Sequence, residues 1–354
     1  MWTENKLFQA DLERLATGEA IGWAALEGKT VLVTGATGLI GRTLICALLH
    51  YNRRFRAGIK VAALVRDLDK AKAAFGKEPA GQEDLFFVQG TIEELPPIPF
   101  PVHYIVHGAS PTASAYFARH PVETAMTNVV GTRNMLELAK EKGVSGFVYL
   151  SSMEVYGSPQ TDAPIYEEYP TAVDPMSARS SYPQAKLMCE NLCAGYCGEF
   201  GVPAKVVRLA QTMGPGVLID DSRVFAQFGR AVMRGEDIIL QTSGSSKRTY
   251  LYSVDAASAI LTVLTRGESG QAYNAANPET YCSILEMAHS VSNLADPPVQ
   301  VRVCLDEKAA SVYSPVHCYN LRSDKLWALG WRPTASLLEM YKRMILAWED
   351  KADT

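Results

Sequence analysis

Apolar and polar residues alternate along this chain in two different rhythms. Short apolar runs of strand length are separated by longer segments in which apolar residues recur every three or four positions. A short continuous apolar run predicts a buried strand, and the longer period predicts a helix. Strands that alternate with helices predict a parallel sheet covered on both faces, which is an α/β fold. The expected strands are Thr30–Val33, Lys60–Val65, Leu85–Val88, Val102–His107 and Gly146–Ser151, and the expected helices include Leu39–His50 and Val122–Lys142.

The two ends of the chain differ from this alternating body. Residues 1–27 carry apolar residues at helical spacing among polar ones, which predicts an amphipathic helical extension. After Arg208 the alternation becomes irregular, and stretches rich in glycine and proline divide it into short elements. We therefore expect a main domain over residues 28–208 and a smaller lobe, mainly for substrate, over residues 209–354. A segment near 248–265 is expected to return to the main sheet.

Composition and charge exclude several classes of function. Of the 354 residues, 47% are hydrophobic and 20% are charged, and the formal net charge is −4 with acids and bases interspersed. This balance argues against a general affinity for nucleic-acid backbone or for an anionic membrane. The longest apolar runs are too short to cross a bilayer, and charges throughout Met1–Ala20 leave no apolar core for a secretory signal. We expect no nucleic-acid or membrane partner and a cytoplasmic protein.

Three of the seven cysteines form a regular pattern. Cys189, Cys193 and Cys197 recur every four residues, so they share one face of a helix. The alternatives are a metal or redox site and a stripe of thiols that faces the core. We interpret the stripe as core packing and expect no metal, because no fourth ligand lies nearby and cysteine is commonly buried. An odd number of cysteines without paired spacing indicates free thiols.

A glycine-rich turn joins the first strand to the first helix of the alternating body. The segment Thr34-Gly-Ala-Thr-Gly-Leu-Ile-Gly41 has the spacing G-x-x-G-x-x-G. Such a turn lets the backbone approach a pyrophosphate, and the N–H groups and positive dipole of the next helix face the phosphates. Between a strand and a helix this motif predicts a Rossmann-type doubly wound sheet that binds NAD or NADP. The expected contact residues are Gly35, Thr37, Gly38, Leu39, Ile40 and Gly41.

The choice between NAD and NADP rests on the end of the second strand. Asp67 is able to accept hydrogen bonds from the ribose 2′-hydroxyl of NAD, whereas Arg66 is able to pair with the 2′-phosphate of NADP. Arg66 directly follows the strand, and we lean to NADP for that reason.

A phenol and an ammonium are placed together later in the chain. Tyr182 and Lys186 stand four residues apart and so share one helical face. Because a neighbouring ammonium stabilises a phenolate, we expect Lys186 to lower the pKa of Tyr182 and also to hold a ribose hydroxyl. Tyr182 would take a proton from a substrate hydroxyl while a hydride leaves for the nicotinamide. Ser152 is expected to hydrogen-bond the same substrate oxygen, and Glu154 is a candidate proton shuttle.

These motifs, in this order, resemble those of the extended short-chain dehydrogenase/reductase family, the NAD-dependent epimerase/dehydratase group. The resemblance covers the chain from Lys29 to Trp348. It rests on Thr34–Gly41, His107–Ser110 (H-x-A-[AS]), Asn128–Leu136 (N-x-x-G-T-x-N-x-L), Ser151–Gly157 (S-S-x-x-V-Y-G), Tyr182 with Lys186, Arg208–Pro215, Arg248–Tyr250 and Leu329–Pro333 (L-G-W-x-P).

The resemblance implies roles for residues that spacing alone does not assign. It implies a catalytic hydroxyl on Ser152, a nucleotide-sugar substrate that is oxidised at C4, and a homodimer formed through paired helices. It further implies cofactor contacts at His107, Ala109, Ser110 and Asn128.

Within the family, the chain looks most like the UDP-glucuronate decarboxylases and sugar-nucleotide dehydratases. Arg179 and Arg223 carry that likeness together with Glu154. Arg248 is the implied clamp for the diphosphate or the sugar acid. Gln211 stands where the family often has an asparagine that contacts the nucleotide.

One departure leaves the reaction open between epimerisation, elimination and decarboxylation. Met153 occupies the position at which dehydratases carry an acid and decarboxylases often a hydroxyl, and it has no proton to donate. The alternatives are an enzyme that oxidises and re-reduces its substrate and a net NADPH-dependent reductase of a 4-keto sugar. A non-catalytic dinucleotide sensor is a third interpretation, against which the retained Ser152, Tyr182 and Lys186 argue.

Overall fold

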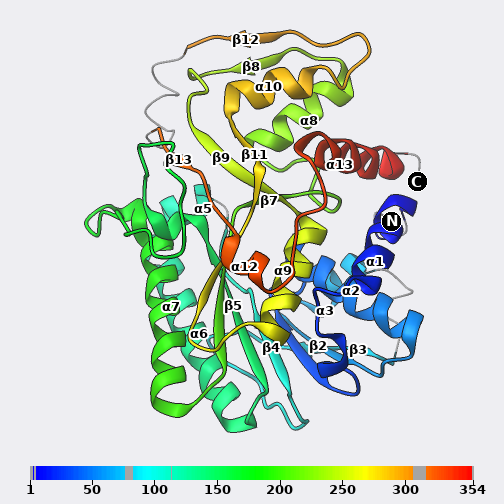
Figure 1. Cartoon of the computed structure of the whole chain (residues 1–354), viewed down its shortest axis with the longest axis vertical. Helices are drawn as coiled ribbons and strands as arrows, with labels where there is room; N and C mark the ends of the chain where they lie inside the picture. Colours follow the sequence, from blue (N-terminus) through cyan, green and yellow to red (C-terminus); the bar gives the residue numbers. More distant parts are fainter. Residues whose placement is uncertain (1–2, 4, 76–82, 113, 306–315, 353–354) are drawn as a thin grey trace.

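A seven-stranded parallel sheet forms the centre of the larger lobe (Figure 1). The computed structural model describes residues 3, 5–75, 83–112, 114–305 and 316–352. The strand order is β10-β6-β5-β4-β1-β2-β3, and all neighbouring strands pair in parallel. The strands are β1 Thr30–Thr34, β2 Lys60–Val65, β3 Leu85–Gln89, β4 Tyr104–His107, β5 Gly146–Ser152, β6 Ala204–Leu209 and β10 Ala272–Ala275. This confirms the predicted α/β fold with its doubly wound parallel sheet.

Two apolar cores lie on opposite faces of this sheet. Val31 and Val33 of β1 join one core, while Leu32 between them joins the other, because successive side chains of a strand point to opposite faces. The first core is covered by α2 (Leu39–Phe55), α3 (Leu68–Phe75) and α9 (Ser253–Arg266), and the second by α6 (Pro121–Lys142) and α7 (Ser181–Phe200). In the second core Cys189 and Cys193 are buried, and Cys197 is half-buried; all three are free thiols.

The smaller lobe lies above the carboxyl edge of the large sheet (Figure 1). Its main sheet has the order β11-β9-β13, with β7 also paired to β9, and β8 and β12 form a separate pair. The strands are β7 Gln211–Met213, β8 Ile238–Leu240, β9 Lys247–Tyr252, β11 Asn277–Ser283, β12 Val301–Val303 and β13 Cys318–Tyr319. Its helices are α8 Val224–Arg234, α10 Ile284–Ser292 and α13 Leu337–Ala352, whereas α12 Asp324–Ala328 lies beside β10 of the large sheet (Figure 1).

The segment near 248–265 lies differently from our expectation. Its strand β9 belongs to the smaller sheet, and its helix α9 packs on the large one. The strand that returns to the large sheet is β10, which pairs with β6. The reason is connection length: a parallel strand beside β6 needs a crossover helix first, and α9 supplies it. Strand β9 is thereby free to pass above the edge of the large sheet.

The N-terminal extension packs against both lobes. Helix α1 (Lys6–Thr17) begins at Asn5, whose side chain accepts hydrogen bonds from the N–H groups of Leu7 and Phe8. The buried carboxylate of Asp11 accepts a hydrogen bond of 2.7 Å from the Tyr252 hydroxyl at the end of β9. A short 3-10 helix, η2 (Trp23–Ala25), follows before β1.

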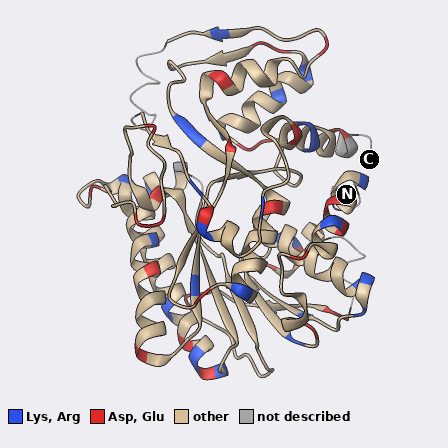
Figure 2. Ribbon diagram, viewed as in Figure 1, with Lys and Arg blue, Asp and Glu red and all other residues tan. Residues whose placement is uncertain are grey.

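The surface is mixed in charge, and no long apolar helix emerges from it. Figure 2 shows basic and acidic residues distributed over both lobes. Across the ranges that the structure describes, no helix is both long and apolar enough to cross a membrane. In the same ranges no three His, Cys, Asp or Glu side chains gather in a way that could hold a metal ion.

Candidate active site

The glycine turn between β1 and α2 brings the backbone close to the loop after β4. Gly35 has a φ of 69°, and a Cβ built on it would lie 2.7 Å from the Gly108 carbonyl, so only glycine fits. A Cβ on Gly41 would overlap the Gly35 carbonyl oxygen. Gly38 precedes α2 without a side-chain cap, which leaves the first N–H groups of the helix open for a ligand. These residues fit a dinucleotide pyrophosphate.

The Thr34 hydroxyl holds this turn to the next strand edge. It accepts hydrogen bonds of 3.1 Å from the N–H groups of Gly108 and Ala109. It also contacts Nδ1 of His107 at 2.7 Å, and Nε2 of His107 contacts the Thr132 hydroxyl at 3.1 Å. Burial, with the charge of Lys186, lowers the His107 pKa to about 3, so the ring stays neutral. Both ring nitrogens are therefore engaged by threonine hydroxyls.

Two other residues expected at the cofactor have local roles in the structure. Asn128 is buried in α6, where its amide donates to the Thr124 carbonyl at 2.8 Å. The half-buried Ser110 lies in the loop after β4, and its hydroxyl donates to the Pro111 carbonyl at 3.2 Å. Whether either also touches a cofactor stays a prediction.

The two charged residues after β2 differ in what they contact. Asp67 Oδ1 accepts hydrogen bonds from the N–H groups of Asp69 and Lys70 at 3.1 and 3.0 Å, at the start of α3. The bond from the Lys70 N–H is the main reason that the Asp67 pKa lies below its ordinary value. The side chain of Arg66, by contrast, is exposed at the carboxyl end of the strand.

Ser152, Tyr182 and Lys186 come together at the carboxyl end of β5. Tyr182 is buried on the first turn of α7, within hydrogen-bonding distance of the Ser152 side chain. The Lys186 ammonium donates to the Leu150 carbonyl at 2.7 Å and lies 5.6 Å from the centre of the Tyr182 ring. Tyr182 and Lys186 therefore lie on the same face of α7, as predicted. The phenol is next to Ser152, and the ammonium binds the carbonyl of Leu150, two residues earlier in β5.

Our expectation that Lys186 lowers the Tyr182 pKa is wrong for this structure. Burial raises the Tyr182 pKa, the Glu154 carboxylate raises it further, and only the hydrogen bond with Ser152 acts in the other direction. Lys186 is itself desolvated, which lowers its pKa to about 8, and its ammonium is directed to the Leu150 carbonyl.

Glu154 is the centre of a charged cluster next to Tyr182. It lies in η3 (Met153–Tyr156), where Ser152 Oγ accepts from its N–H at 3.2 Å. Burial raises the Glu154 pKa, and the nearby charges of Arg179 and Arg248 counteract it. Arg179 comes from η4 (Ala178–Ser180) and Arg248 from β9, so both lobes contribute a cation to this carboxylate.

Arg248 is held on two sides within the smaller lobe. Its Nη1 donates to Gln211 Oε1 at 3.4 Å, and its Nη2 lies 2.6 Å from Nε2 of His317. Gln211 and Arg248, both predicted to bind substrate, are therefore brought together. Arg223 is engaged elsewhere: at the start of α8 its guanidinium pairs with Asp221 at 2.5 Å, and its role toward substrate stays a prediction.

Phe117 and Tyr319 contribute to the site without any motif that would have indicated them. Phe117, on α5 (Ser114–Arg119), stacks on the Tyr182 ring with centroids 5.0 Å apart, and the Arg179 guanidinium lies 5.6 Å from its centre. Tyr319 is buried, and its hydroxyl donates a hydrogen bond to the Gly157 carbonyl. Burial and the nearby charge of Glu154 raise the Tyr319 pKa. No motif of the sequence points to His317, the residue before β13, which also lies at the site.

A buried ion pair fixes the catalytic helix to the large sheet. Glu190, two turns after Tyr182, pairs with Arg208 of β6 at 2.7 Å and also accepts a 2.5 Å hydrogen bond from the Ser151 hydroxyl. Arg208 further donates to the Tyr156 hydroxyl at 2.9 Å. These contacts fix the position of α7 relative to β5, β6 and η3.

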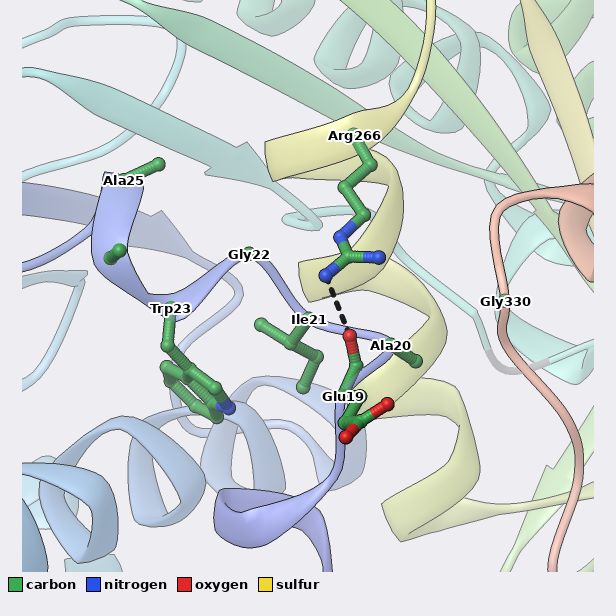
Figure 3. A pocket seen from close by; sticks show the side chains of 9 residues that line it. Glu19, Ala20, Ile21, Gly22, Trp23, Ala25, Arg266 and Gly330 are labelled. Carbon is green, nitrogen blue, oxygen red and sulfur yellow. Dashed lines mark hydrogen bonds between the residues drawn. The ribbon is translucent and has the colours of Figure 1, made fainter.

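A separate hollow of about 740 Å³ lies between the N-terminal extension and the end of α9 (Figure 3). It is lined by residues 19–25 together with Arg266 and Gly330, and Arg266 donates to the Glu19 carbonyl at 2.6 Å. Its lining includes no residue of the cluster around Glu154.

Comparison with known proteins agrees with this geometry. A model of the NAD dependent epimerase/dehydratase family matches residues 31–276. The chain belongs to this family. Among curated relatives, UDP-glucuronic acid decarboxylase 6 of Arabidopsis thaliana is 30% identical over 273 residues, which are 77% of this chain and 76% of that protein. UDP-glucuronic acid decarboxylase 1 of Xenopus tropicalis is 27% identical over 90% of this chain and 71% of its own.

Solved structures show the same fold in other members of the epimerase/dehydratase family. An epimerase from Methanothermobacter thermautotrophicus superposes with a TM-score of 0.76 at 23% identity, over 94% of this chain and 95% of that one. A dTDP-glucose 4,6-dehydratase from Bacillus anthracis, in complex with NAD, gives 0.72 at 20% identity over 92% and 98%. In the present chain, the region that matches the family model ends at residue 276, before His317.

Replacing Lys186 with methionine is expected to stabilise the fold. Burial lowers its pKa from 10.5 to about 8, so below pH 8 the folded chain holds a desolvated ammonium that the unfolded chain does not. The unfolded state binds more protons between pH 8 and 10.5, so this cost fades as pH rises through that window. We expect the variant to gain about 1–3 kcal/mol at pH 7 and little at pH 10, by urea unfolding.

The control for this variant is the exposed Lys60, which pairs with Asp84 at the surface. Lys60→Met should change the free energy of unfolding by less than about 1 kcal/mol at either pH. A Lys186→Met protein that is less stable than wild type at pH 7 would show that the hydrogen bond to the Leu150 carbonyl outweighs the desolvation.

Proposed function

We propose that this chain is an NAD-dependent enzyme that oxidises C4 of a nucleotide-linked uronic acid and then releases its carboxyl group as carbon dioxide. The observation that carries the proposal is the grouping of Tyr182 and Ser152 with a carboxylate, Glu154, that has Arg179 and Arg248 beside it. Two guanidinium groups suit an anionic sugar. The names of the curated relatives support the same substrate class.

The first step uses the phenol and the hydroxyl at the end of β5. Ser152 and Tyr182 would hold the C4 hydroxyl of the sugar, and its proton would pass to Tyr182 Oη. When bound, NAD supplies a hydride acceptor at this carbon and later a hydride donor. Burial and Glu154 raise the Tyr182 pKa, which favours the neutral phenol that returns this proton at the end of the cycle.

The second step breaks the bond between C5 and the carboxyl group. A C4 ketone accepts the electron pair that carbon dioxide leaves on C5, and a proton must then be added to C5. Glu154 is placed to deliver it, because burial raises its pKa and so favours the protonated carboxyl group. Return of the hydride to C4, with the proton from Tyr182, completes a redox-neutral cycle.

Met153 favours loss of carbon dioxide over loss of water. Elimination of a hydroxyl group requires an acid to protonate it, and the buried thioether of Met153 has no proton to give. Decarboxylation has no such requirement, because its leaving group is neutral.

The exposed Arg66 favours NADP as an alternative cofactor. Asp67, which would otherwise accept the ribose 2′-hydroxyl, already caps α3, while Arg66 is available for a 2′-phosphate. This observation also favours the second candidate function, a net reductase of a 4-keto nucleotide sugar.

Mass spectrometry of products from UDP-glucuronate distinguishes these functions. The protein is incubated with UDP-glucuronate, UDP-glucose and dTDP-glucose, both without added cofactor and with NADPH, and the dinucleotide released on denaturation is identified by its mass. We expect loss of carbon dioxide from UDP-glucuronate alone, with no net consumption of cofactor. Loss of water from a neutral sugar, or turnover only with stoichiometric NADPH, would contradict the proposal.

A homodimer is part of the proposal. Val122 and Met126 on α6 and Met188 on α7 are exposed apolar side chains on the two helices that pack together outside the second core. Pairing of these helices with those of a second copy would cover them.

A further inference from the structure

We propose that His317 is a positioning residue that holds the Arg248 guanidinium toward the sugar, and that proton uptake by His317 weakens substrate binding. The inference rests on the proposed function in that Arg248 is taken as a substrate ligand. It concerns a residue outside the region matched by the family.

The contact is short and buried. Nε2 of His317 lies 2.6 Å from Nη2 of Arg248, and His317 exposes only 7% of its surface. The His317 ring is kept in place by its neighbours, because its carbonyl accepts the Lys247 N–H at 2.8 Å and its ring lies 4.9 Å from that of Tyr319. The guanidinium is thus gripped by His317 on one nitrogen and by Gln211 on the other.

The chemistry of the pair determines its protonation. A guanidinium has five N–H donors and no acceptor, so a hydrogen bond between the two side chains requires a lone pair on Nε2. His317 is therefore neutral in this arrangement and carries its proton on Nδ1. Protonation would replace a hydrogen bond by two cations in contact, and Arg248, which does not deprotonate, would be pushed away.

Among the described residues, further charged groups lie close to this pair. On β9, Lys247 is a further cation, paired with Asp162 at 2.9 Å. On β13 the titratable neighbours are Cys318 and Tyr319. In the described part of the chain, Glu154 lies close enough to Arg248 and to Arg179 to interact with both charges.

Of these, only Glu154 is an acid that faces Arg248. When His317 is protonated, the Arg248 guanidinium would move toward the Glu154 carboxylate. Arg248 would then pair with Glu154 and would no longer bind the substrate.

The test compares three histidine variants in steady-state kinetics with UDP-glucuronate from pH 5.5 to 8. His317→Gln keeps an acceptor for Arg248 but does not titrate, and His317→Leu keeps volume without an acceptor. His289→Gln, an exposed histidine of α10, is the matched control. Binding of UDP-glucuronate and of UDP, followed by calorimetry at pH 5.5 and 7.5, provides a readout that does not require turnover.

We expect KM of the wild type and of His289→Gln to rise about tenfold from pH 7.5 to 5.5, with a smaller change in kcat. In His317→Gln most of this rise in KM should disappear, and any part that remains is due to protonation of Glu154. His317→Leu should have a KM raised about tenfold at every pH, because nothing holds Arg248. A wild-type acid limb that persists unchanged in His317→Gln would overturn the inference, as would a normal KM for His317→Leu.

The two proposals fail in different ways. If UDP-glucuronate is bound but not decarboxylated, the proposed reaction is wrong, while the calorimetric pH dependence still tests His317. If decarboxylation occurs and binding is equally tight at both pH values, the reaction stands and the role of His317 is wrong.

Discussion

Tyr182→Phe is expected to lower kcat by about a thousandfold while the dinucleotide stays bound. The change removes one hydroxyl from a buried ring that stacks on Phe117, so the packing of α7 is retained. What is lost is the phenol that hydrogen-bonds the Ser152 side chain, and with it the proposed proton acceptor for the sugar hydroxyl. Single-turnover kinetics and a titration of bound cofactor measure the two effects separately.

Tyr341→Phe is the matched control for this experiment. Tyr341 is a buried tyrosine of α13 whose hydroxyl has no hydrogen-bond partner within the described part of the chain. Its loss should leave kcat unchanged. A Tyr182→Phe enzyme that turns over at the wild-type rate would remove the proposed proton path.

Glu190→Ala is expected to destabilise the fold by about 3–5 kcal/mol, because it leaves the Arg208 guanidinium buried without its carboxylate. The two side chains are only 10% and 14% exposed, and Glu190 also holds the Ser151 hydroxyl. Urea unfolding measures the loss. The surface pair of Arg302 with Asp237 is the control, and Asp237→Ala should cost less than about 1 kcal/mol.

The double variant Glu190→Leu with Arg208→Met separates charge from packing. Replacing both charges by apolar groups should recover most of the stability, because no unpaired ion remains. If Glu190→Ala alone unfolds no more easily than wild type, the pair does not hold α7 in register.

The fold could be predicted from the sequence because the signals were local. The run from Val31 to Val33 is apolar at every position, as a strand buried on both faces requires, and the glycines at 35, 38 and 41 form a recognisable spacing within one turn. The returning strand was misplaced because Lys247–Tyr252 and Ala272–Ala275 are both short, and only the three-dimensional connection decides which of them joins β6.

The site was predictable in its residues and less so in their electrostatics. Tyr182 and Lys186 share a helical face as their spacing requires, but the pKa of a phenol depends on its burial and on Glu154, which reaches it from another element. His317 and Phe117 had no spacing relation to any motif. Their positions follow from tertiary packing across β13 and α5, which no local pattern encodes.

Asp11 connects three parts of the molecule that are far apart in sequence. Its carboxylate accepts from the Tyr252 hydroxyl on β9, pairs with Arg14 of its own helix at 2.9 Å, and faces Arg343 of α13 at 3.5 Å. Strand β9 also carries Arg248, four residues before Tyr252. The hydrogen bond to Asp11 therefore anchors the far end of the strand that carries this arginine, and we expect a substitution of Asp11 to alter substrate affinity although Asp11 lies outside the site.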